Sequence, residues 1–258
     1  MNSEDPLLPP GFRLLRYDTI DSTNAEAKRL ARAGALPGTV VWAAEQSAGR
    51  GRRGRSWVSP PGNLYTSLLL DPECDPASAA QLGFVAAVAL AEAVEAIAAR
   101  AATVQCKWPN DLLANGRKLA GILLESETGP GGGLQFLVLG IGVNLASSPS
   151  GTAFPATSLA GEGIAGVAPG DLLAGFLPAM AGWLQRWRET GFAPVRTAWL
   201  ARAAALGRTI VVRGDSTSCR GRFVDLDERG TLILEGETGR RRFAAGEVFP
   251  ADLSSPGG

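Results

Sequence analysis

Residues 49–55 read Gly-Arg-Gly-Arg-Arg-Gly-Arg, a run that holds only glycine and arginine. Glycine lets the backbone approach a ligand closely and present its N–H groups, and arginine adds a planar set of donors that fits phosphate and carboxylate oxygens. The run lies inside the chain, between the stretches 39–45 and 63–70, which both read as strands. The pattern therefore predicts a loop between two strands that closes over an anion.

The spacing Gly49-x-Gly51-x-x-Gly54 also matches the fingerprint of dinucleotide-binding βαβ units. That fingerprint requires a helix that opens at the loop and holds the pyrophosphate on its N-terminus. Here Ser-Trp-Val-Ser-Pro-Pro follows at 56–61, and this segment cannot begin a helix. The chain also has no His-Arg-Asp, Asp-Phe-Gly or Walker lysine motif. A solvated arginine-rich loop or an RNA-binding segment is the remaining alternative.

The composition restricts both partners and chemistry. The 258 residues are 45% hydrophobic, enough for a large core, and the formal net charge is zero, so we expect no nucleic-acid partner. The chain has no histidine, which excludes Ser-His-Asp triads, Cys-His pairs and His-ligated metals. Its three scattered cysteines fit neither a disulfide framework nor a zinc pattern, which indicates a reducing cytoplasm.

The most apolar stretch of the sequence is 82–101. It contains Glu92 and Glu95 at its middle and is rich in alanine, so we expect a buried helix. The first residues lack the cationic and apolar regions of a signal peptide. These features predict a cytoplasmic protein with no membrane partner.

Periodicity and turn signals predict helices and strands along the whole chain. Strands are expected at 12–17, 39–45, 63–70, 103–108, 118–125 and 135–144, with a glycine-rich turn at 129–133. A capping box at Thr23-Asn-Ala-Glu26 begins the first helix, Ser78 caps a second that runs to about residue 100, and further helices are expected at 171–189, kinked by Pro178, and at 195–205. Short strands at 209–213, 219–225, 231–235 and 240–244 predict a small antiparallel barrel. We therefore divide the chain into a domain at 1–206 and a domain at 207–258.

Lysine is scarce, with three among the 25 Lys and Arg residues, at positions 28, 107 and 118. A lysine kept in such a chain indicates a need for a compact ammonium group. Lys107 opens the segment Lys107-Trp-Pro-Asn-Asp111, and Lys118 follows in the expected hairpin, so both can point at one site. A plain ion pair between Lys107 and Asp111 at a strand-to-turn junction is the alternative.

Six motifs follow one another across residues 17–145. They are Ser22-Thr-Asn24, Glu45-Gln46 with the Gly-Arg run to Trp57, Gly62-Asn-Leu-Tyr65, Lys107-Trp-Pro-Asn-Asp-Leu112, Lys118-Leu-Ala-Gly-Ile-Leu123 and Gly140-Ile-Gly-Val-Asn144. In order and spacing they strongly resemble the biotin–protein ligases. The resemblance implies an α+β fold, a mixed β-sheet with packed helices of the class II synthetase-like type, plus a small C-terminal SH3-like β-barrel.

The resemblance also implies a two-step reaction. Biotin and Mg-ATP form biotinyl-5′-adenylate, and the biotinyl group then passes to a lysine of the biotin carboxyl carrier protein of acetyl-CoA carboxylase or a related carboxylase. The first step brings together two anions that repel, so positioning and charge neutralisation can catalyse it without a protein nucleophile. The product is labile in water, and a Gly-Arg loop suits a lid that orders over it.

Individual residues receive roles from the same resemblance. The expected catalytic cations are Lys118, Arg50, Arg52 and Lys107. Biotin is expected to contact Ser22, Thr23, Asn24, Gln46, Gly49, Arg50, Trp57, Lys118 and Gly121, with Leu123 beside its valeryl chain. ATP and the adenylate are expected to contact Arg50, Arg52, Arg53, Arg55, Trp57, Lys107, Asn110 and Asn144, with Phe154 a candidate for the adenine-stacking aromatic. Asp111 either holds Mg²⁺ or orients Lys107.

Several alternatives stay open. A lipoate– or octanoate–protein ligase shares the acyl-adenylate chemistry, although the Gly-Arg run and Lys-Trp-Pro-Asn-Asp argue against it. A non-catalytic sensor would bind biotin without releasing pyrophosphate, and an RNA binder would lose affinity steeply with salt. The first motif begins at Ser22, which leaves no room for a helix-turn-helix, so we expect no transcriptional repressor activity. A monomer and a homodimer are both compatible with the sequence.

Overall fold

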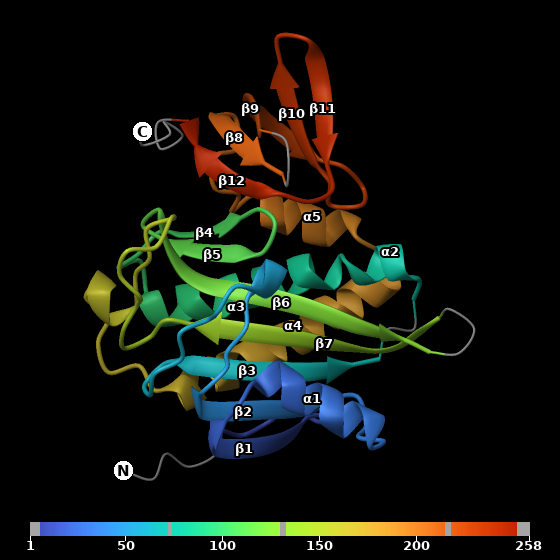
Figure 1. Cartoon of the computed structure of the whole chain (residues 1–258), viewed down its shortest axis with the longest axis vertical. Helices are drawn as coiled ribbons and strands as arrows, with labels where there is room; N and C mark the ends of the chain where they lie inside the picture. The colour runs from blue at the N-terminus through green and yellow to red at the C-terminus, as the bar shows by residue number, and fades with distance from the viewer. Residues whose placement is uncertain (1–5, 72–73, 130–132, 215–217, 252–258) are drawn as a thin grey trace.

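The structure, a computed structural model that describes residues 6–71, 74–129, 133–214 and 218–251, contains two β-sheets (Figure 1). The larger has seven strands in the order β1-β2-β3-β7-β6-β5-β4. These strands are β1 (Arg13–Ile20), β2 (Thr39–Gln46), β3 (Leu64–Leu70), β4 (Val104–Lys107), β5 (Asp111–Ala114), β6 (Arg117–Thr128) and β7 (Leu134–Val143). β1 and β2 pair in parallel and the other neighbours are antiparallel, which confirms the predicted mixed sheet.

Helices α3 (Leu82–Ala98) and α4 (Pro169–Thr190) cover one face of this sheet (Figure 1). Twelve of the 17 residues of α3 are buried, because the helix is apolar on all sides and packs against α4, α5 (Ala193–Leu200) and strands β4 to β6. The stretch Pro76–Ala98 is long and apolar enough to span a membrane, yet 67% of its apolar window is buried inside the protein. This agrees with the prediction of a buried helix.

Helix α1 (Thr23–Arg32) packs on the opposite face against β2, β3 and β7, with Ala27 in a small apolar cluster beside Val41 and Leu69. The rest of this face, over β6 and β7, receives the loop that joins β2 to β3 (Figure 1). This loop carries the Gly-Arg run and the short 3-10 helix η1 (Arg52–Gly54). The fold therefore leaves one end of the sheet face open for a site.

The start of α1 differs from the predicted capping box by one residue. Ser22 is the N-cap, and its hydroxyl accepts from the Ala25 N–H at 3.5 Å. The Thr23 hydroxyl instead lies 3.1 Å from Oε1 of Gln46 on β2. Thr23 therefore does not cap the helix, because its hydroxyl contacts a residue that is distant in sequence.

Two other helices also differ from their predicted limits. Asp75, and not Ser78, caps a short helix α2 (Pro76–Ala79) by accepting from backbone N–H groups, and α3 begins separately at Leu82. Helix α5 ends at Leu200 instead of 205, while α4 continues through Pro178. The expected turn at 129–133 lies partly outside the described residues.

Strand β5 is the main feature of the larger sheet that the sequence did not predict. Its four residues are all buried, which is too short a run to show an alternation of apolar and polar residues. β5 pairs with both β4 and β6, so two hairpins stand where one was expected. In the first hairpin Lys107 lies opposite Asp111.

The second sheet is antiparallel and has five strands in the order β11-β10-β9-β8-β12. Its strands are β8 (Thr209–Arg213), β9 (Ser218–Leu226), β10 (Leu232–Gly236), β11 (Gly239–Phe243) and β12 (Glu247–Pro250), of which β12 was not predicted. Within the described residues β11 and β12 do not pair, so the predicted antiparallel strands form an open sheet and no closed barrel is found. β12 pairs with β8 on the side of the larger sheet, whereas β10 and β11 extend away from it (Figure 1). The division at 206 and 207 stays a prediction.

Asn63 ties the loop after β7 to the turn before β3. Its Oδ1 accepts from the backbone N–H groups of Leu145, Ala146 and Ser147 at 2.8, 2.9 and 3.2 Å, and its Nδ2 donates to the Ser147 carbonyl at 3.0 Å. Asn63 is 2% exposed, so water does not replace these bonds. The anchored loop continues into residues 149–156, which border the open end of the sheet face.

We expect Asn63→Ala to lower the free energy of unfolding by about 1–3 kcal/mol, because buried N–H groups lose their acceptor. The control Ser147→Ala removes an exposed side chain in the same loop and should stay within about 0.5 kcal/mol of the unmodified chain. Equilibrium unfolding in urea measures both values. Equal effects of the two substitutions would contradict the anchoring role of Asn63.

Candidate functional site

A cavity of about 430 Å³ lies between the larger sheet, the Gly-Arg loop and strand β12. This volume is within the range of about 300–1,000 Å³ that small-molecule sites occupy. The lining includes most of the residues predicted from the sequence: Ser22, Thr23, Asn24, Gln46, Arg50, Arg52, Arg55, Trp57, Lys107, Asn110, Asp111, Lys118, Gly121, Leu123, Asn144 and Phe154. The fold thus brings segments that are distant in sequence to one place.

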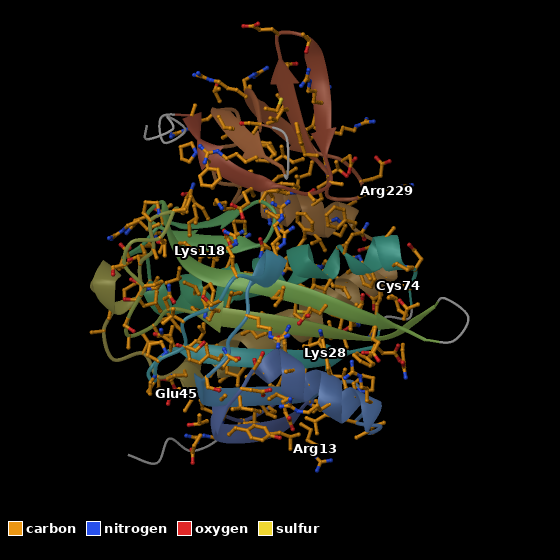
Figure 2. All side chains as sticks on the ribbon, viewed as in Figure 1. Arg13, Lys28, Glu45, Cys74, Lys118 and Arg229 are labelled. Carbon is orange, nitrogen blue, oxygen red and sulfur yellow. The ribbon has the colours of Figure 1, made fainter. Side chains whose placement is uncertain are left out.

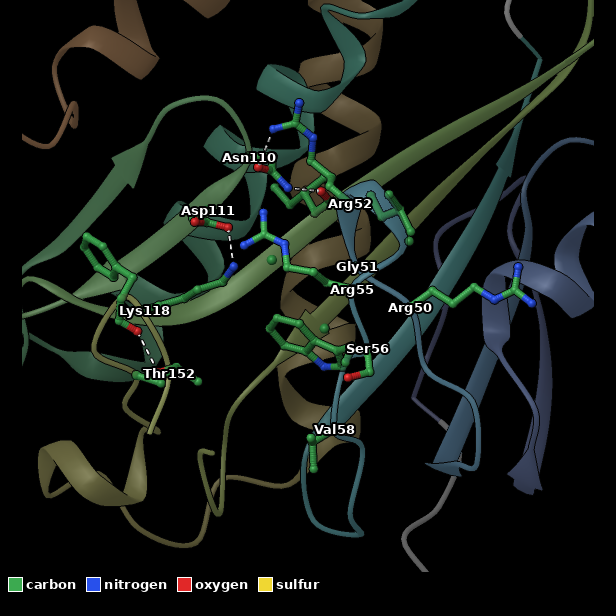
Figure 3. A pocket seen from close by; sticks show the side chains of 18 of the residues that line it. Arg50, Gly51, Arg52, Arg55, Ser56, Val58, Asn110, Asp111, Lys118 and Thr152 are labelled. Atoms are coloured by element: carbon green, nitrogen blue, oxygen red, sulfur yellow. Dashed lines mark hydrogen bonds and ion pairs between the residues drawn. The ribbon is translucent and has the colours of Figure 1, made fainter. Parts of the chain in front are cut away.

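Asp111, at the start of β5, lies between two of the three lysines. Its Oδ2 accepts from Lys107 Nζ at 2.9 Å and its Oδ1 lies 2.6 Å from Lys118 Nζ (Figure 3). The side chains of Lys107 and Asp111 are each 9% exposed, whereas that of Lys118 is 27% exposed. Both carboxylate oxygens are therefore occupied, and Lys118 offers the more accessible ammonium group.

Burial alone would raise the pKa of the Asp111 carboxyl. The charges of Lys107 and Lys118 and the hydrogen bonds from both ammonium groups outweigh burial and lower this pKa below its usual value. Asp111 is therefore ionised, and the three groups together carry one net positive charge. A buried cationic site of this kind attracts an anion strongly because the surrounding dielectric is low.

The Gly-Arg loop is closed by its own backbone. The Gly51 N–H donates to the Arg55 carbonyl at 2.7 Å, and the Trp57 N–H donates to the Gly49 carbonyl at 2.9 Å. Arg52 reaches across the cavity and donates to Asn110 Oδ1 at 3.1 Å. The loop thus holds one of its arginines above the strand pair that carries Asp111.

The other arginines of the loop point in different directions. Arg55 forms an ion pair with Glu247 of β12, which joins the loop to the second sheet. Arg50 extends away from Asp111 and Lys118 (Figure 3). Arg53, with a φ of 56°, is exposed and lies outside the lining, as does Gly49. The proposed contacts of Arg53 and Gly49 with a ligand remain predictions.

Gly49 has a structural explanation of its own. A Cβ at this position would lie 2.4 Å from the Trp57 carbonyl oxygen and 2.6 Å from Ser59 Oγ. Gly49 is therefore needed for the loop to close on itself. This crowding is a reason for glycine at position 49 that does not depend on a ligand.

Glycines on β6 and β7 let two side chains lie flat on the sheet. A Cβ at Gly140 would lie 2.0 Å from Asn24 Oδ1, and a Cβ at Gly142 would lie 2.5 Å from Trp57 Nε1. Gly121, which pairs with Gly142, would place a Cβ 3.0 Å from the same indole. The Trp57 Nε1 is buried and has no hydrogen-bond partner among the residues that the structure describes, so it can donate to a ligand.

Four polar side chains line the end of the cavity next to α1 and form a polar wall: Ser22, Thr23, Asn24 and Gln46. The Thr23 N–H donates to Gln46 Oε1 at 2.8 Å, and Gln46 Nε2 donates to Ser59 Oγ at 2.9 Å. These bonds fix the orientation of the Gln46 amide. Buried neutral donors and acceptors in fixed positions are suited to a polar ring without net charge.

Asn110 and Asn144 both hold backbone segments at the edge of the cavity. Asn110 Nδ2 donates to the Ile122 carbonyl at 2.6 Å while its Oδ1 accepts from Arg52. Asn144 is 2% exposed, and its Nδ2 donates to the Thr157 carbonyl at 3.0 Å. The amide of Asn144 therefore anchors the segment after Phe154.

The second sheet contributes Glu247 and Phe249, which sequence reasoning missed because β12 was not predicted. The rings of Phe154 and Phe249 have centroids 6.5 Å apart, and Lys107 Nζ lies 4.5 Å from the centroid of Phe154. The adjacent apolar residues Val248 and Phe249 were the available signal, but a four-residue strand is too short to recognise from sequence. The aromatic pair forms a surface on which a planar ring can stack.

The arrangement can hold two anions close together beside an aromatic surface. Five cations from three separate segments line the cavity: Arg50, Arg52, Arg55, Lys107 and Lys118. Among the described residues, the lining carboxylates are Asp111 and Glu247, so the cations exceed the carboxylates by three. The polar wall and the Gly121–Gly142 strand pair lie on the α1 side of these charges, where an uncharged ring and an alkyl chain fit.

Comparisons with known proteins agree with this arrangement. A sequence model of the Biotin/lipoate A/B protein ligase family matches residues 17–144, and one of the biotin protein ligase C-terminal domain matches residues 205–249. A biotin–[acetyl-CoA-carboxylase] ligase of Paracoccus denitrificans is 48% identical over 89% of this chain and 97% of its own length. The bifunctional ligase/repressor BirA of Bacillus subtilis is 34% identical over 94% of this chain and 74% of its own length.

A solved structure is also similar. The biotin protein ligase from Aquifex aeolicus in complex with biotin and ATP superposes with a TM-score of 0.79 at 28% identity, over 92% of this chain and 97% of that one. A match over 92% of the chain includes residues of both sheets. By sequence and by fold, the chain belongs to the biotin/lipoate protein ligase family, among its biotin–protein ligases.

Proposed function

We propose that this chain activates biotin with ATP in the described cavity and transfers the biotinyl group to a lysine of a carrier protein. One observation carries the assignment of the site: two lysines share the buried carboxylate of Asp111 directly beneath the arginine loop. The relatives named biotin–[acetyl-CoA-carboxylase] ligase support the activity. A structure of a related ligase with both biotin and ATP supports the choice of substrates.

In the first step a biotin carboxylate oxygen attacks the α-phosphorus of ATP, and pyrophosphate leaves. Lys118 contacts the carboxylate and later the acyl-phosphate oxygen, because it is the more exposed of the two lysines. Lys107 and Arg52 contact the phosphates. These cations neutralise the repulsion between the two anions and the charge that develops in the transition state.

The substrates divide the cavity by chemistry. The ureido ring of biotin binds at the polar wall of Ser22, Thr23, Asn24 and Gln46, and its valeryl chain passes Trp57, Gly121 and Leu123. The adenine ring stacks on Phe154, and Phe249 closes the same side. Asn144 then acts on the nucleotide through the segment that it anchors.

Magnesium binds as part of the nucleotide substrate, Mg-ATP. Both oxygens of Asp111 are held by lysines, and the described residues contain no group of three or more His, Cys, Asp or Glu that could hold a metal ion. Mg²⁺ keeps several waters and is commonly bound by substrate phosphates. We therefore prefer the orienting role of Asp111 to a role as a metal ligand.

In the second step the amine of a carrier lysine attacks the acyl carbon of the adenylate, and AMP leaves. We propose the biotin carboxyl carrier protein of a biotin-dependent carboxylase as the carrier, in the cytoplasm, where ATP is available and the three thiols stay reduced. The ion pair between Arg55 and Glu247 holds the loop next to the cavity. A closed loop protects the adenylate from water before the carrier arrives.

The direct test incubates the protein with ATP, Mg²⁺, labelled biotin and a biotin carboxyl carrier domain, with lipoate as competitor. We expect label on the carrier, and an excess of lipoate should not reduce it. Transfer of lipoate instead of biotin would favour a lipoate–protein ligase. Binding of biotin without release of pyrophosphate would leave a sensor.

Lys118→Ala should lower biotin-dependent pyrophosphate release by about 10²- to 10³-fold, because the more exposed of the two lysines at the meeting point of the anions is lost. The control Arg117→Ala removes an adjacent exposed cation that pairs with Glu162 outside the cavity. It should release pyrophosphate at the rate of the unmodified chain. Similar rates for both variants would contradict the role of Lys118.

Arg52→Gly should increase the escape of adenylate, trapped by hydroxylamine, about tenfold or more, because a charged contact of the loop to Asn110 is lost. Arg117→Ala is the control, because it removes an exposed arginine that pairs with Glu162 outside the cavity lining. Its adenylate should escape at the normal rate. Equal escape from both variants would show that the loop does not retain the adenylate through Arg52.

A further inference from the structure

The third lysine, Lys28, lies on α1 and away from Lys118 (Figure 2). Its Nζ is 2.5 Å from Oε1 of Glu125 on β6. The two side chains are 23% and 27% exposed, so the pair is largely removed from water. Neither residue lines the cavity, and the proposed reaction does not use either of them.

Glu125 is connected to the polar wall through Asn24. Its second oxygen, Oε2, accepts from Asn24 Nδ2 at 2.8 Å. Burial raises the pKa of the Glu125 carboxyl, but the bonds from Lys28 and Asn24 and the charges of Lys28 and Arg50 lower it below its usual value. Glu125 is therefore ionised and can only accept, so Asn24 must turn its NH₂ group toward it.

The orientation of the Asn24 amide determines the direction of the hydrogen bonds made by the Ser67 and Thr23 hydroxyls. Its Oδ1 faces Ser67 Oγ at 2.6 Å and carries no proton, so the single Ser67 proton is directed to Asn24. Thr23 Oγ1 lies 2.8 Å from Ser67 Oγ and 3.1 Å from Gln46 Oε1. Ser67 already donates its proton to Asn24, and Gln46 Oε1 can only accept. The Thr23 hydroxyl therefore donates to one of these two oxygens.

The consequence reaches the surface of the cavity. With its own proton committed inside the wall, the Thr23 hydroxyl keeps a lone pair and can only accept from a ligand. Thr23, Asn24 and Gln46 line the cavity, whereas Ser67 is fully buried behind them. The negative charge of Glu125 thus draws the protons of the wall away from the cavity and leaves acceptors for N–H groups.

We propose that Lys28 and Glu125 are a positioning pair that sets the hydrogen-bond polarity of the biotin-binding wall. The inference rests on the proposed function, because the N–H donors that the wall would accept from are those of the ureido ring. A glutamine in place of Glu125 can donate as well as accept. It permits Asn24 to turn over, so that Ser67 can donate to Thr23 and the Thr23 hydroxyl can donate to the ligand.

A purely structural role, in which the pair docks α1 on β6, has a matched control in the same chain. Arg32 of α1 pairs with Glu127 of β6 at 2.5 Å, one helical turn and two strand residues farther on. In that pair Arg32 is exposed and Glu127 is half-buried, and both lie outside the cavity lining. Glu127→Gln therefore removes a helix-to-strand ion pair without a connection to the wall.

The experiment measures the dependence of pyrophosphate release on biotin and on ATP for Glu125→Gln and Glu127→Gln. For Glu125→Gln we expect the KM for biotin to rise about tenfold or more, with the KM for ATP unchanged. The variant should also discriminate less against a biotin analogue methylated on a ureido nitrogen. Glu127→Gln should match the unmodified chain in all three measurements.

Variants of Lys28 test the same inference if Glu125→Gln fails to fold. Lys28→Met should raise the KM for biotin, and Lys28→Arg, which retains the charge, should restore it. Equal biotin KM values for Glu125→Gln and Glu127→Gln, or a failure of Lys28→Met to change the KM, would overturn the inference. Absence of biotin-dependent pyrophosphate release from the unmodified chain would instead overturn the proposed function.

Discussion

The site depends on one buried carboxylate that is shared by two lysines. Asp111 holds Lys107 and Lys118 within 2.9 and 2.6 Å, although the three groups come from three strands. Removing one partner of a buried ion pair leaves an uncompensated charge and commonly costs about 3–5 kcal/mol. The short strand β5 is therefore fixed between β4 and β6, and Asn110, next to Asp111, receives Arg52 from the loop above. One constraint thus sets the positions of three cations.

Each of the three lysines is paired with a carboxylate at or behind the cavity. Lys107 and Lys118 share Asp111 where the two anions meet, and Lys28 binds Glu125 behind the polar wall. At the shared Asp111 carboxylate, a compact ammonium group can approach one oxygen end-on, whereas the flat guanidinium of arginine requires a wider space. In a chain that otherwise uses arginine, the positions of its lysines therefore carry structural information. Two of these positions could be interpreted from the sequence, and the third required the structure.

The sequence predicted the parts of the site that depend on local motifs. The Gly-Arg run, the two lysines of the cavity and the glycines at 140 and 142 stand at strand ends or close approaches, where residue type is dictated locally. The strands that the sequence did not predict, β5 and β12, are each four residues long. They can be recognised only from the strands with which they pair. The same reason explains Ser22 as the cap of α1, because Gln46 takes the Thr23 hydroxyl. The open second sheet depends on how β12 pairs with β8, which no local pattern encodes.

The central claim is that Asp111 catalyses indirectly, by holding two cations where biotin and ATP meet. Biotin-dependent isotope exchange between pyrophosphate and ATP tests this claim most directly, with Asp111→Asn compared to the unmodified chain at saturating substrates. We predict that exchange falls by about 10²-fold or more while biotin still binds, because the polar wall is intact and only the cations are displaced. Exchange at the unmodified rate in a folded Asp111→Asn protein would contradict the account.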